Sequence, residues 1–384
     1  MSAQSRIIPV IGLLCYCRPG YEQNLAQELE QHCAQANLFG YAKAKPDSGF
    51  VFFSLYAPLS LDIDAETNKT VLDFSTLMFA RQLLCVVAHL PLLDRQDRLQ
   101  EIEQALIDIF PANTDPQAKT LFATAVVESA DTEEGKELSK FCRKVSVPFR
   151  QMLRQQQWLM RRKFQHALVG NTLHAFFEHG SAAYIALSLN HNRSQHENGI
   201  YRLKFPQDAP SRSTLKLEEA IQTFLSAQQQ SMLLCKGLSA VDLGACPGGW
   251  TYQLVQRGVH VEAVDNGAMD PALMATGLVT YAAADGFTYR PEYGKVDWLV
   301  CDMIEQPSRV AALMAHWLVE GLASHAIFNL KLPMKQRYTA MQSAQSGIEA
   351  ALNKAKIDFT WQAKHLYHNR DEVTVCIITK PQNT

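Results

Sequence analysis

The sequence has no apolar run approaching the roughly 20 residues needed to span a membrane, no internal repeat and no low-complexity tract. Its nine cysteines are scattered from Cys15 to Cys376 without the C-x-x-C pairs of a zinc site. An odd number of cysteines also cannot complete a disulfide framework. We therefore expect reduced thiols, no metal centre and no membrane association.

Neither sign of charge is in excess. The chain carries 36 Lys and Arg against 38 Asp and Glu, with a formal net charge of −2 at pH 7. This balance excludes a globally basic nucleic-acid-binding protein but allows a local basic face. With 384 residues, 47% of them hydrophobic, the chain has the length of two or three globular domains.

A signal peptide is disfavoured at the N-terminus. The apolar run after Arg6 is followed by no small-residue cleavage site, and Arg18-Pro-Gly20 is a turn leading into a helical pattern. The run is better interpreted as a strand over residues 7–17. We expect a cytoplasmic protein.

The first 90 residues predict a β-α-β-β-α-β order. This order is typical of a ferredoxin-like unit, a frequent but not specific scaffold among RNA-associated proteins. The expected strands are 7–17, 39–44, 50–56 and 83–89, and the expected helices are 22–35 and 74–81.

Leu90-Pro91 marks a predicted domain boundary. Beyond it the pattern predicts helices over 97–110 and 138–162, the second interrupted at Pro148, and strands over 121–128, 173–178 and 182–189. Residues 191–200 are polar and turn-rich and are interpreted as a linker. The histidines there, His191 and His196, lack a Cys or carboxylate partner at ligand spacing and are expected to be solvated.

One stretch lacks negative charge altogether. No Asp or Glu occurs from Lys140 to Phe177. Positive charge without counter-charge is typical of a phosphate-binding face, so we favour RNA binding here over a solvated amphipathic helix with core aromatics. The cations are Lys140, Arg143, Lys144, Arg150, Arg154, Arg161, Arg162 and Lys163, and the interleaved aromatics are Phe141, Phe149, Trp158 and Phe164.

The second half predicts a doubly wound α/β sheet. After a helix over 212–227, strands alternate with helical stretches in most intervals. The last two strands are joined by a tight polar turn at 369–371 and should be antiparallel, which departs from a dinucleotide-binding sheet and suits a methyltransferase. The expected strands are 240–244, 260–264, 278–282, 297–301, 325–330, 359–365 and 373–379.

A glycine loop follows the first of these strands. Gly244-Ala-Cys-Pro-Gly248-Gly249 lacks the second glycine of G-x-G-x-x-G, so it does not match a pyrophosphate cradle. Asp265, about 20 residues past the loop, is placed to accept hydrogen bonds from the ribose hydroxyls of a cofactor. Both NAD and S-adenosylmethionine have such hydroxyls. Asp285 is placed for an adenine amino group, although Asp-Gly is also an ordinary turn. The loop favours S-adenosylmethionine.

Charged residues stand at the ends of several predicted elements. Asp302 and Lys331 end the fourth and fifth strands, and Lys216 lies in the helix before the sheet. Glu372 lies in the turn just before the seventh strand. Because open α/β sheets bind ligands at the carboxyl ends of their strands, we expect these four side chains to converge at one edge.

This set, together with DLGACPGGW, resembles the K-D-K-E tetrad of FtsJ-type ribose 2′-O-methyltransferases. Longer stretches resemble the RlmM family of bacterial large-subunit ribosomal RNA cytidine 2′-O-methyltransferases, closely over 200–384 and more loosely before. These stretches begin at Arg202, Ala209 and Phe328 in the second half, and at Phe79 and Lys140 in the first.

The resemblance implies an α/β fold with a C-terminal Rossmann-like seven-stranded methyltransferase sheet and N-terminal α+β ferredoxin-like and THUMP domains. The expected divisions are a ferredoxin-like domain over 1–90, a THUMP-type RNA-binding domain over 91–190, the linker over 191–200 and the methyltransferase domain over 201–384. It also implies S-adenosyl-L-methionine as cofactor. The implied cofactor contacts are Ser213, Cys246, Pro247, Gly248, Gly249, Asp265, Asp285 and Asp302.

The chemistry suggests a role for each tetrad member. A ribose 2′-hydroxyl is a poor nucleophile and needs a base and in-line placement. A lysine acts as a base only if its pKa is lowered, for which a neighbouring cation and partial desolvation suffice. We therefore expect Lys331 to be the base and Lys216 to orient the ribose, with Asp302 and Glu372 positioning the lysines.

The resemblance implies 23S ribosomal RNA as substrate, and we expect a monomer acting before full subunit assembly. Three alternatives stay open at this point. They are a methyltransferase for another polymer or small molecule, an RNA-binding or assembly factor with a vestigial site, and an NAD dehydrogenase.

Overall fold

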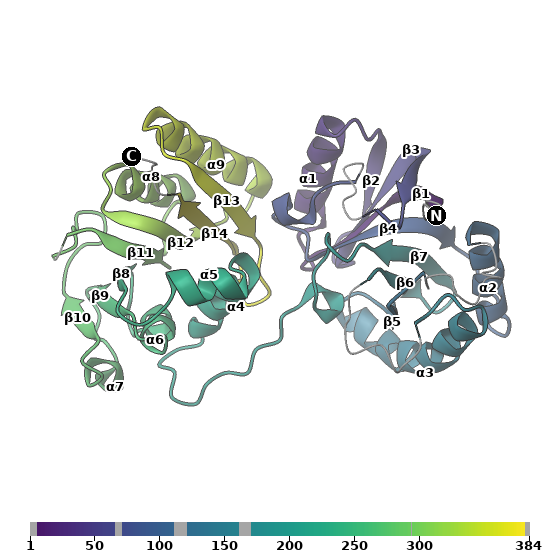
Figure 1. Cartoon of the computed structure of the whole chain (residues 1–384), viewed down its shortest axis with the longest axis horizontal. Coiled ribbons are helices and arrows are strands. Elements are labelled where there is room, and N and C mark those ends of the chain that lie inside the picture. The colour runs from purple at the N-terminus through teal and green to yellow at the C-terminus, as the bar shows by residue number, and fades with distance from the viewer. Residues whose placement is uncertain (1–5, 66–70, 111–120, 161–169, 293, 381–384) are drawn as a thin grey trace, which may run out of the picture. The chain divides into compact units, whose positions relative to one another are not determined.

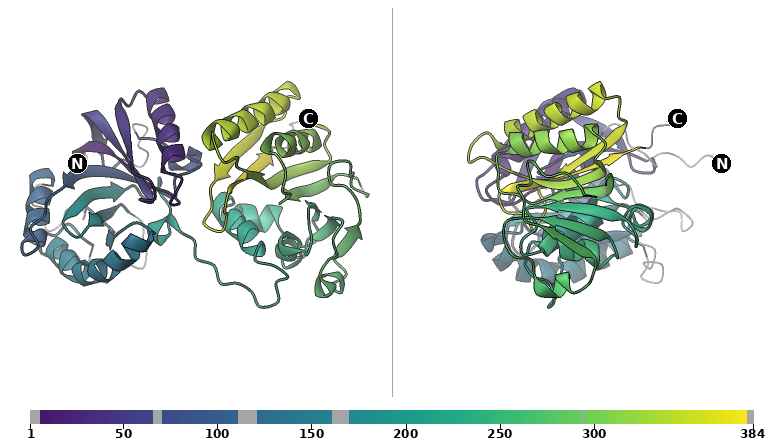
Figure 2. Two further views of the ribbon diagram at one scale, coloured as in Figure 1. Left: turned by 180° about the vertical axis from the view of Figure 1, so that it is seen from behind. Right: turned by 90° about the vertical axis from the view of Figure 1, so that its left-hand side faces the viewer.

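The computed structural model describes residues 6–65, 71–110, 121–160, 170–292 and 294–380. The chain divides into two compact units, Met1–Ile200 and Tyr201–Thr384 (Figure 1). Each unit contains one seven-stranded sheet with helices packed on it (Figure 2). No helix in the described part of the chain is long and apolar enough to cross a membrane.

The sheet of the first unit has the order β2-β3-β1-β4-β7-β6-β5. Its first four strands follow the ferredoxin-like order, and β4 then pairs with β7, so one sheet continues past the predicted boundary at residue 90. The division into domains over 1–90 and 91–190 stays a prediction. The elements are β1 (Ile7–Tyr16), α1 (Glu22–Gln35), β2 (Gly40–Ala44), β3 (Phe50–Asp62), β4 (Gln82–Leu90), α2 (Arg98–Ile109), β5 (Thr124–Glu128), α3 (Glu133–Gln155), β6 (Thr172–His179) and β7 (Ala182–Ser188).

The helix predicted over 74–81 is wrong. Only a short 3-10 turn forms, η1 (Phe74–Thr76). The backbone N–H groups of Met78 and Phe79 donate to the carboxylate of Glu28 on α1, at 2.5 and 2.9 Å. Glu28 is fully buried. Because its side chain accepts these amide protons, the segment satisfies its backbone without a helix.

Helix α3 also departs from its prediction. It begins at Glu133, where the side chain of Thr132 accepts the N–H of Gly135, and it passes through Pro148 without ending. It stops at Gln155 rather than 162, because Gln157 takes a left-handed conformation with φ of +58°. The predicted residues Arg161, Arg162, Lys163 and Phe164 lie outside the described residues.

Two of the aromatic residues interleaved with these cations, Phe149 and Trp158, belong to the core. Phe149 and Trp158 are fully buried, and Phe141 packs edge-on against Phe177 with ring centroids 5.0 Å apart. Phe149 and Trp158 are therefore not available to stack on bases, whereas Phe141 is partly buried. From residue 140 onward, the exposed charged residues of α3 are Lys140, Arg143 and Lys144.

The sheet of the second unit has the order β10-β9-β8-β11-β12-β14-β13. β14 is antiparallel to both of its neighbours, as predicted for the last two strands, and the other neighbours are parallel. All seven predicted strands are present, with ends within two residues, so the α/β expectation is confirmed. The strands are β8 (Ser239–Leu243), β9 (His260–Val264), β10 (Val279–Ala282), β11 (Val296–Cys301), β12 (Ala323–Lys331), β13 (Phe359–Lys364) and β14 (Glu372–Thr379).

Helices cover this sheet, with α8 and α9 on one side and α4 and α6 on the other (Figure 1). Strands covered on both faces are apolar almost throughout. Asp242, Asn329 and Thr374 are exceptions, since each is polar, lies within a strand and is fully buried. The helices are α4 (Thr214–Phe224), α5 (Ala227–Leu233), α6 (Gly249–Val255), α7 (Pro271–Met274), α8 (Pro307–Val319) and α9 (Arg337–Lys354).

Candidate active site

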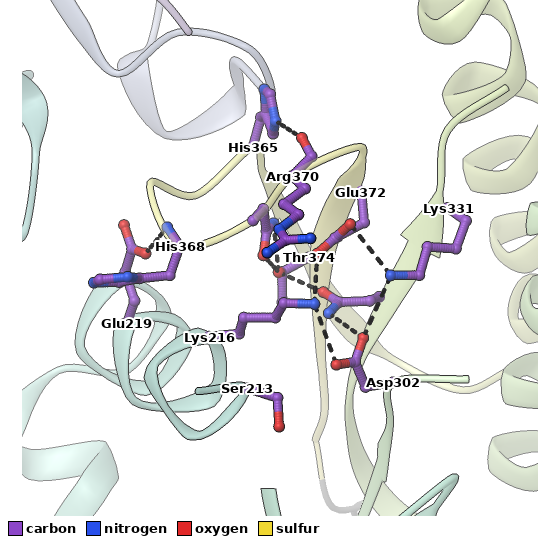
Figure 3. Close-up of polar contacts among 12 residues, drawn as sticks. Ser213, Lys216, Glu219, Asp302, Lys331, His365, His368, Arg370, Glu372 and Thr374 are labelled. Atoms are coloured by element: carbon purple, nitrogen blue, oxygen red, sulfur yellow. Dashed lines mark hydrogen bonds and ion pairs between the residues drawn. The ribbon is translucent and has the colours of Figure 1, made fainter. Parts of the chain in front are cut away.

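Four charged side chains from four elements meet at one edge of the second sheet (Figure 3). Lys216 comes from α4, Asp302 follows β11, Lys331 ends β12 and Glu372 begins β14. Each lysine contacts both carboxylates. Lys216 Nζ lies 2.5 Å from Glu372 Oε1 and 3.3 Å from Asp302 Oδ2. Lys331 Nζ lies 3.2 Å from Glu372 Oε2 and 3.9 Å from Asp302 Oδ1.

The two lysines are held unequally. The side chain of Lys216 is 16% exposed and that of Lys331 is 24% exposed. Burial opposes the charged form of Lys216, but Asp302 and Glu372 outweigh it and raise its pKa. Burial likewise opposes ionisation of Glu372, but the two lysines outweigh it and lower its pKa. Lys216 is therefore a permanent ammonium at neutral pH, while Lys331 has the longer contacts and the greater exposure.

A buried chain of hydrogen bonds fixes Asp302. Asn329 Nδ2 donates to Asp302 Oδ1 at 2.7 Å, and the hydroxyl of Thr374 donates to Asn329 Oδ1 at 2.6 Å. Asn369 Nδ2 in turn donates to Thr374 Oγ1 at 2.9 Å. Because the hydroxyl has one proton to give, this order orients the Asn329 amide with its donor toward the carboxylate.

Sequence reasoning missed these three residues. Asn329 and Thr374 interrupt apolar strands, which was the available signal. Their pairing depends on register, because Asn329 lies opposite Thr374 across β12 and β14, and Lys331 lies opposite Glu372.

Glu219 ties the loop before β14 to α4. Its carboxylate accepts the backbone N–H groups of Tyr367 and His368, each at 2.8 Å, and its side chain is buried (Figure 3). Lys216 lies three residues earlier, on the same helical face. One helix therefore positions both Lys216 and the loop that leads to Glu372.

The glycine loop packs tightly against the start of α4. Gly248 has φ of +118°, a conformation that favours glycine. A Cβ on Gly249 would lie 2.0 Å from Ser213 Oγ and 2.4 Å from Ser211 Oγ, so no larger residue fits there. The structure thus brings Ser213 directly against the loop.

Asp265 holds the loop from the end of β9. Its Oδ2 accepts the N–H of Cys246 at 3.0 Å, and its Oδ1 accepts the N–H of Gly267 at 2.9 Å. Each carboxylate oxygen retains a second lone pair, so a hydroxyl can still donate to it. Cys246 and Pro247 are exposed and can contact a ligand.

Asp285 lies farther along, after β10. It is exposed, and its Oδ1 accepts the N–H of Phe287 at 2.9 Å, which makes a local turn. The turn leaves the second carboxylate oxygen available as an acceptor.

Asp242, which sequence reasoning also missed, lies in β8 below the loop. Its Oδ2 accepts the hydroxyl of Thr251 at 2.6 Å, while its Oδ1 has no hydrogen-bond partner among the residues that the structure describes. Burial, with a smaller effect of the charges of Asp302 and Asp265, raises the pKa of this carboxyl to about 7, although the hydrogen bond from Thr251 lowers it. A buried acceptor in acidic surroundings suits a cationic ligand group and disfavours a pyrophosphate.

These observations fit S-adenosylmethionine, whose amino and sulfonium groups are cationic, better than a dinucleotide. In the described parts of the chain, no cluster of three or more His, Cys, Asp or Glu side chains is arranged to hold a metal ion.

Comparison with known families gives three matches along the chain. Residues 10–84 match the RlmM ferredoxin-like domain, and residues 97–189 match the N-terminal model of ribosomal RNA large subunit methyltransferase M. Residues 209–355 match the FtsJ-like methyltransferase model.

Full-length relatives agree with these matches. The ribosomal RNA large subunit methyltransferase M of Alteromonas mediterranea is 48% identical, over 96% of this chain and 97% of that protein. The protein of the same name from Pasteurella multocida is 47% identical, over 96% of this chain and 98% of its own length. The solved structure of TrmN from Thermus thermophilus covers 97% of this chain and 100% of that chain, with 14% identity and a TM-score of 0.36, which is too low for a functional comparison.

Proposed function

This chain belongs to the family of ribosomal RNA large subunit methyltransferase M, and from that premise we propose that it methylates the 2′-hydroxyl of a cytidine ribose in 23S ribosomal RNA. The family and the FtsJ-like domain make it an rRNA methyltransferase. We propose the 2′-hydroxyl as the methylated group, cytidine as the modified nucleotide, S-adenosylmethionine as the methyl donor, and an early stage of subunit assembly as the time of reaction.

We assign Lys331 as the general base. In its neutral form Lys331 Nζ accepts the hydroxyl proton as the ribose oxygen attacks the methyl group. The ammonium that forms lies 3.2 Å from Glu372 Oε2 and 3.9 Å from Asp302 Oδ1, so both carboxylates stabilise it. The unequal holding of the two lysines carries this assignment. Lys216 has a raised pKa and contacts at 2.5 and 3.3 Å, and so is a poor base.

Lys216 has a different proposed role. Its permanent charge supplies a hydrogen-bond donor that orients the ribose. Asp302 and Glu372 hold both lysines and balance their charge. Asp302, fixed by Asn329, also lies beside the proposed donor pocket.

The proposed donor is S-adenosylmethionine, which when bound supplies a methyl group on a sulfonium. Asp242 Oδ1 would accept from its amino group, Asp265 from its ribose hydroxyls and Asp285 from its adenine amino group. The donor would be lined by Ser213 and by the loop residues Cys246, Pro247, Gly248 and Gly249. The close packing of Gly249 against Ser213 fixes the backbone of that loop.

Transfer of labelled methyl groups to rRNA that lacks the modification tests the whole proposal. We expect incorporation into 23S RNA, and nucleotide mapping should place it on the ribose of one cytidine. Comparison of naked RNA with assembling particles identifies the stage. No incorporation into either substrate would overturn the proposal.

The first unit is proposed to bind the RNA, with the region 91–190 as a THUMP-type domain. The exposed cations Lys140, Arg143 and Lys144 on α3 support this. Reversal of these three charges should weaken RNA binding and flatten its dependence on salt, because each phosphate contact contributes to that slope. An unchanged slope would remove α3 from the RNA interface.

An NAD dehydrogenase is the weakest alternative. Its ligand would protect the protein from thermal unfolding. Protection by S-adenosylhomocysteine and not by NADH is expected, and the reverse result would favour the dehydrogenase.

A further inference from the structure

Two exposed apolar side chains stand beside the tetrad. Ile304 lies two residues after Asp302 and is 89% exposed, and Met334 lies three residues after Lys331 and is 93% exposed. Within the described part of the second unit, the next most exposed large hydrophobic side chain is Met232, at 64%. β11 and β12 are adjacent and parallel, so both loops leave the same edge of the sheet (Figure 1).

The loop that carries Ile304 is anchored on both sides of it. Before it, Met303 packs so closely on Gly244 that a Cβ there would lie 2.7 Å from Met303 Cγ. After it, Glu305 forms an ion pair with Arg309 on α8. The inward packing of Met303 sends its neighbour out into solvent.

The loop that carries Met334 is anchored in the same way. The N–H of Leu332 donates to the carbonyl of Asp371 at 2.7 Å. Arg337 Nε donates to the carbonyl of Pro333 at 3.3 Å. Both apolar side chains are thus held outward by fixed loops, in a position where burial on a partner would stabilise them.

We propose that Ile304 and Met334 pack against the bases of the rRNA strand next to the methylated nucleotide and so hold its ribose over Lys331. This inference rests on the proposed function. A target ribose at Lys331 Nζ brings its neighbouring bases close to both loops, since stacked bases along a strand are only about 3.4 Å apart. Phosphate groups bind cationic side chains, whereas the flat faces of bases pack against apolar ones. Ile and Met are among the residues that insert between base steps.

Serine substitutions test the contact. Ile304→Ser and Met334→Ser should each lower kcat/KM for unmethylated rRNA by about tenfold, and the double variant by more. Affinity for S-adenosylhomocysteine should not change. Met232→Ser is the matched control, because Met232 lies on α5, which leads into the amino end of β8 at the opposite edge of the sheet.

Two further measurements separate an apolar base contact from other roles. Ile304→Leu and Met334→Leu should keep most of the activity, since they keep an apolar surface. The slope of log affinity against log salt should stay that of the wild type, because no phosphate contact is lost.

Several results would overturn the inference. One is wild-type kcat/KM in the double serine variant. Another is a defect seen only with ribosomal proteins present and absent on naked rRNA, which would make the partner a protein. A wild-type enzyme that methylates no rRNA would overturn the proposed function itself and this inference with it.

Discussion

Each unit of the molecule contains a buried carboxylate that contacts a basic side chain. The two clusters differ in how far solvent and substrate can reach them. In the first unit, Glu128 Oε1 accepts the hydroxyl of Tyr16 at 2.7 Å and lies 2.6 Å from His174 Nδ1. His174 Nε2 lies 2.9 Å from Ser188 Oγ. The side chains of His174 and Glu128 are only 6% and 5% exposed, so this cluster is closed.

The tetrad of the second unit contains the same kinds of group but is open at one side. Glu372 is 3% exposed, while Lys331, its partner across the strands, is 24% exposed. In the closed cluster Tyr16 and His174 both hydrogen-bond Glu128, and His174 also hydrogen-bonds Ser188, which suits a structural role. A catalytic base must be reachable by its substrate, and Lys331 is the more exposed of the two lysines.

Removal of the exposed lysine should have the largest effect. Lys331→Ala deletes the proposed base and should lower methyl transfer by about 10²–10⁴-fold. Cofactor affinity, measured by calorimetry with S-adenosylhomocysteine, should persist. Lys335→Ala, four residues on and fully outside the tetrad, is the control. Normal turnover in Lys331→Ala would refute the base assignment.

Disruption of the chain behind Asp302 should have an intermediate effect. Thr374→Val keeps the shape but removes the hydroxyl that orients Asn329, and a small displacement of a reacting group can cost about 10²-fold. We expect kcat to fall by up to about that factor with cofactor affinity unchanged. The control is Thr379→Val, since the hydroxyl of Thr379 on the same strand bonds Ser324 O at the opposite edge, at 2.7 Å. Equal kcat in the two variants would show that the chain does not position Asp302.

The acidity of Asp242 predicts a pH dependence of cofactor binding. Its pKa is raised to about 7, and a bound ammonium favours the ionised form. Affinity for S-adenosylhomocysteine should therefore rise with pH, by up to about tenfold per pH unit below that pKa, and binding should release a proton. Calorimetry in buffers of different ionisation enthalpy measures that proton. Asp242→Asn should abolish both effects, and a flat wild-type profile would contradict the assignment.

The same shift affects the free protein. An aspartate whose pKa is raised on folding binds more protons in the folded state, so stability falls as pH rises from the unfolded pKa, about 3.9, to about 7. Thermal unfolding across that range checks the sign.

Opening the closed cluster should have the smallest effect on catalysis. Tyr16→Phe removes one donor from buried Glu128 and should lower the free energy of unfolding by about 1–3 kcal/mol. Methyl transfer per folded molecule should not change. Active-site titration gives the amount of active enzyme, and denaturant unfolding gives the change in stability. A loss of kcat without loss of stability would mean that this cluster is more than structural.

Much of the second unit could be predicted from sequence because its signals are local. Strands covered on both faces are apolar runs, and charged residues at their ends are conspicuous. Asp302, Lys331 and Glu372 were selected in this way, and Lys216 by its place in the helix before the sheet. The resemblance to a known family added roles that the pattern itself does not carry.

What sequence missed depends on partners far along the chain. The helix expected over 74–81 is replaced because Glu28, about fifty positions earlier, accepts the amide protons of Met78 and Phe79. The roles of Asn329 and Thr374 require the register of β12 and β14, which no local pattern encodes. The end of α3 depends on a single left-handed residue, Gln157.

The reversed direction of β14 has a consequence for biogenesis. Because β14 runs against β12, its first residue meets the last residue of β12, and Lys331 faces Glu372 while Asn329 faces Thr374. Side chains alternate between faces along a strand, so a slip of one residue would turn both partners away at once. The four charged side chains therefore come together only when the final strand of the sheet is inserted in the correct register.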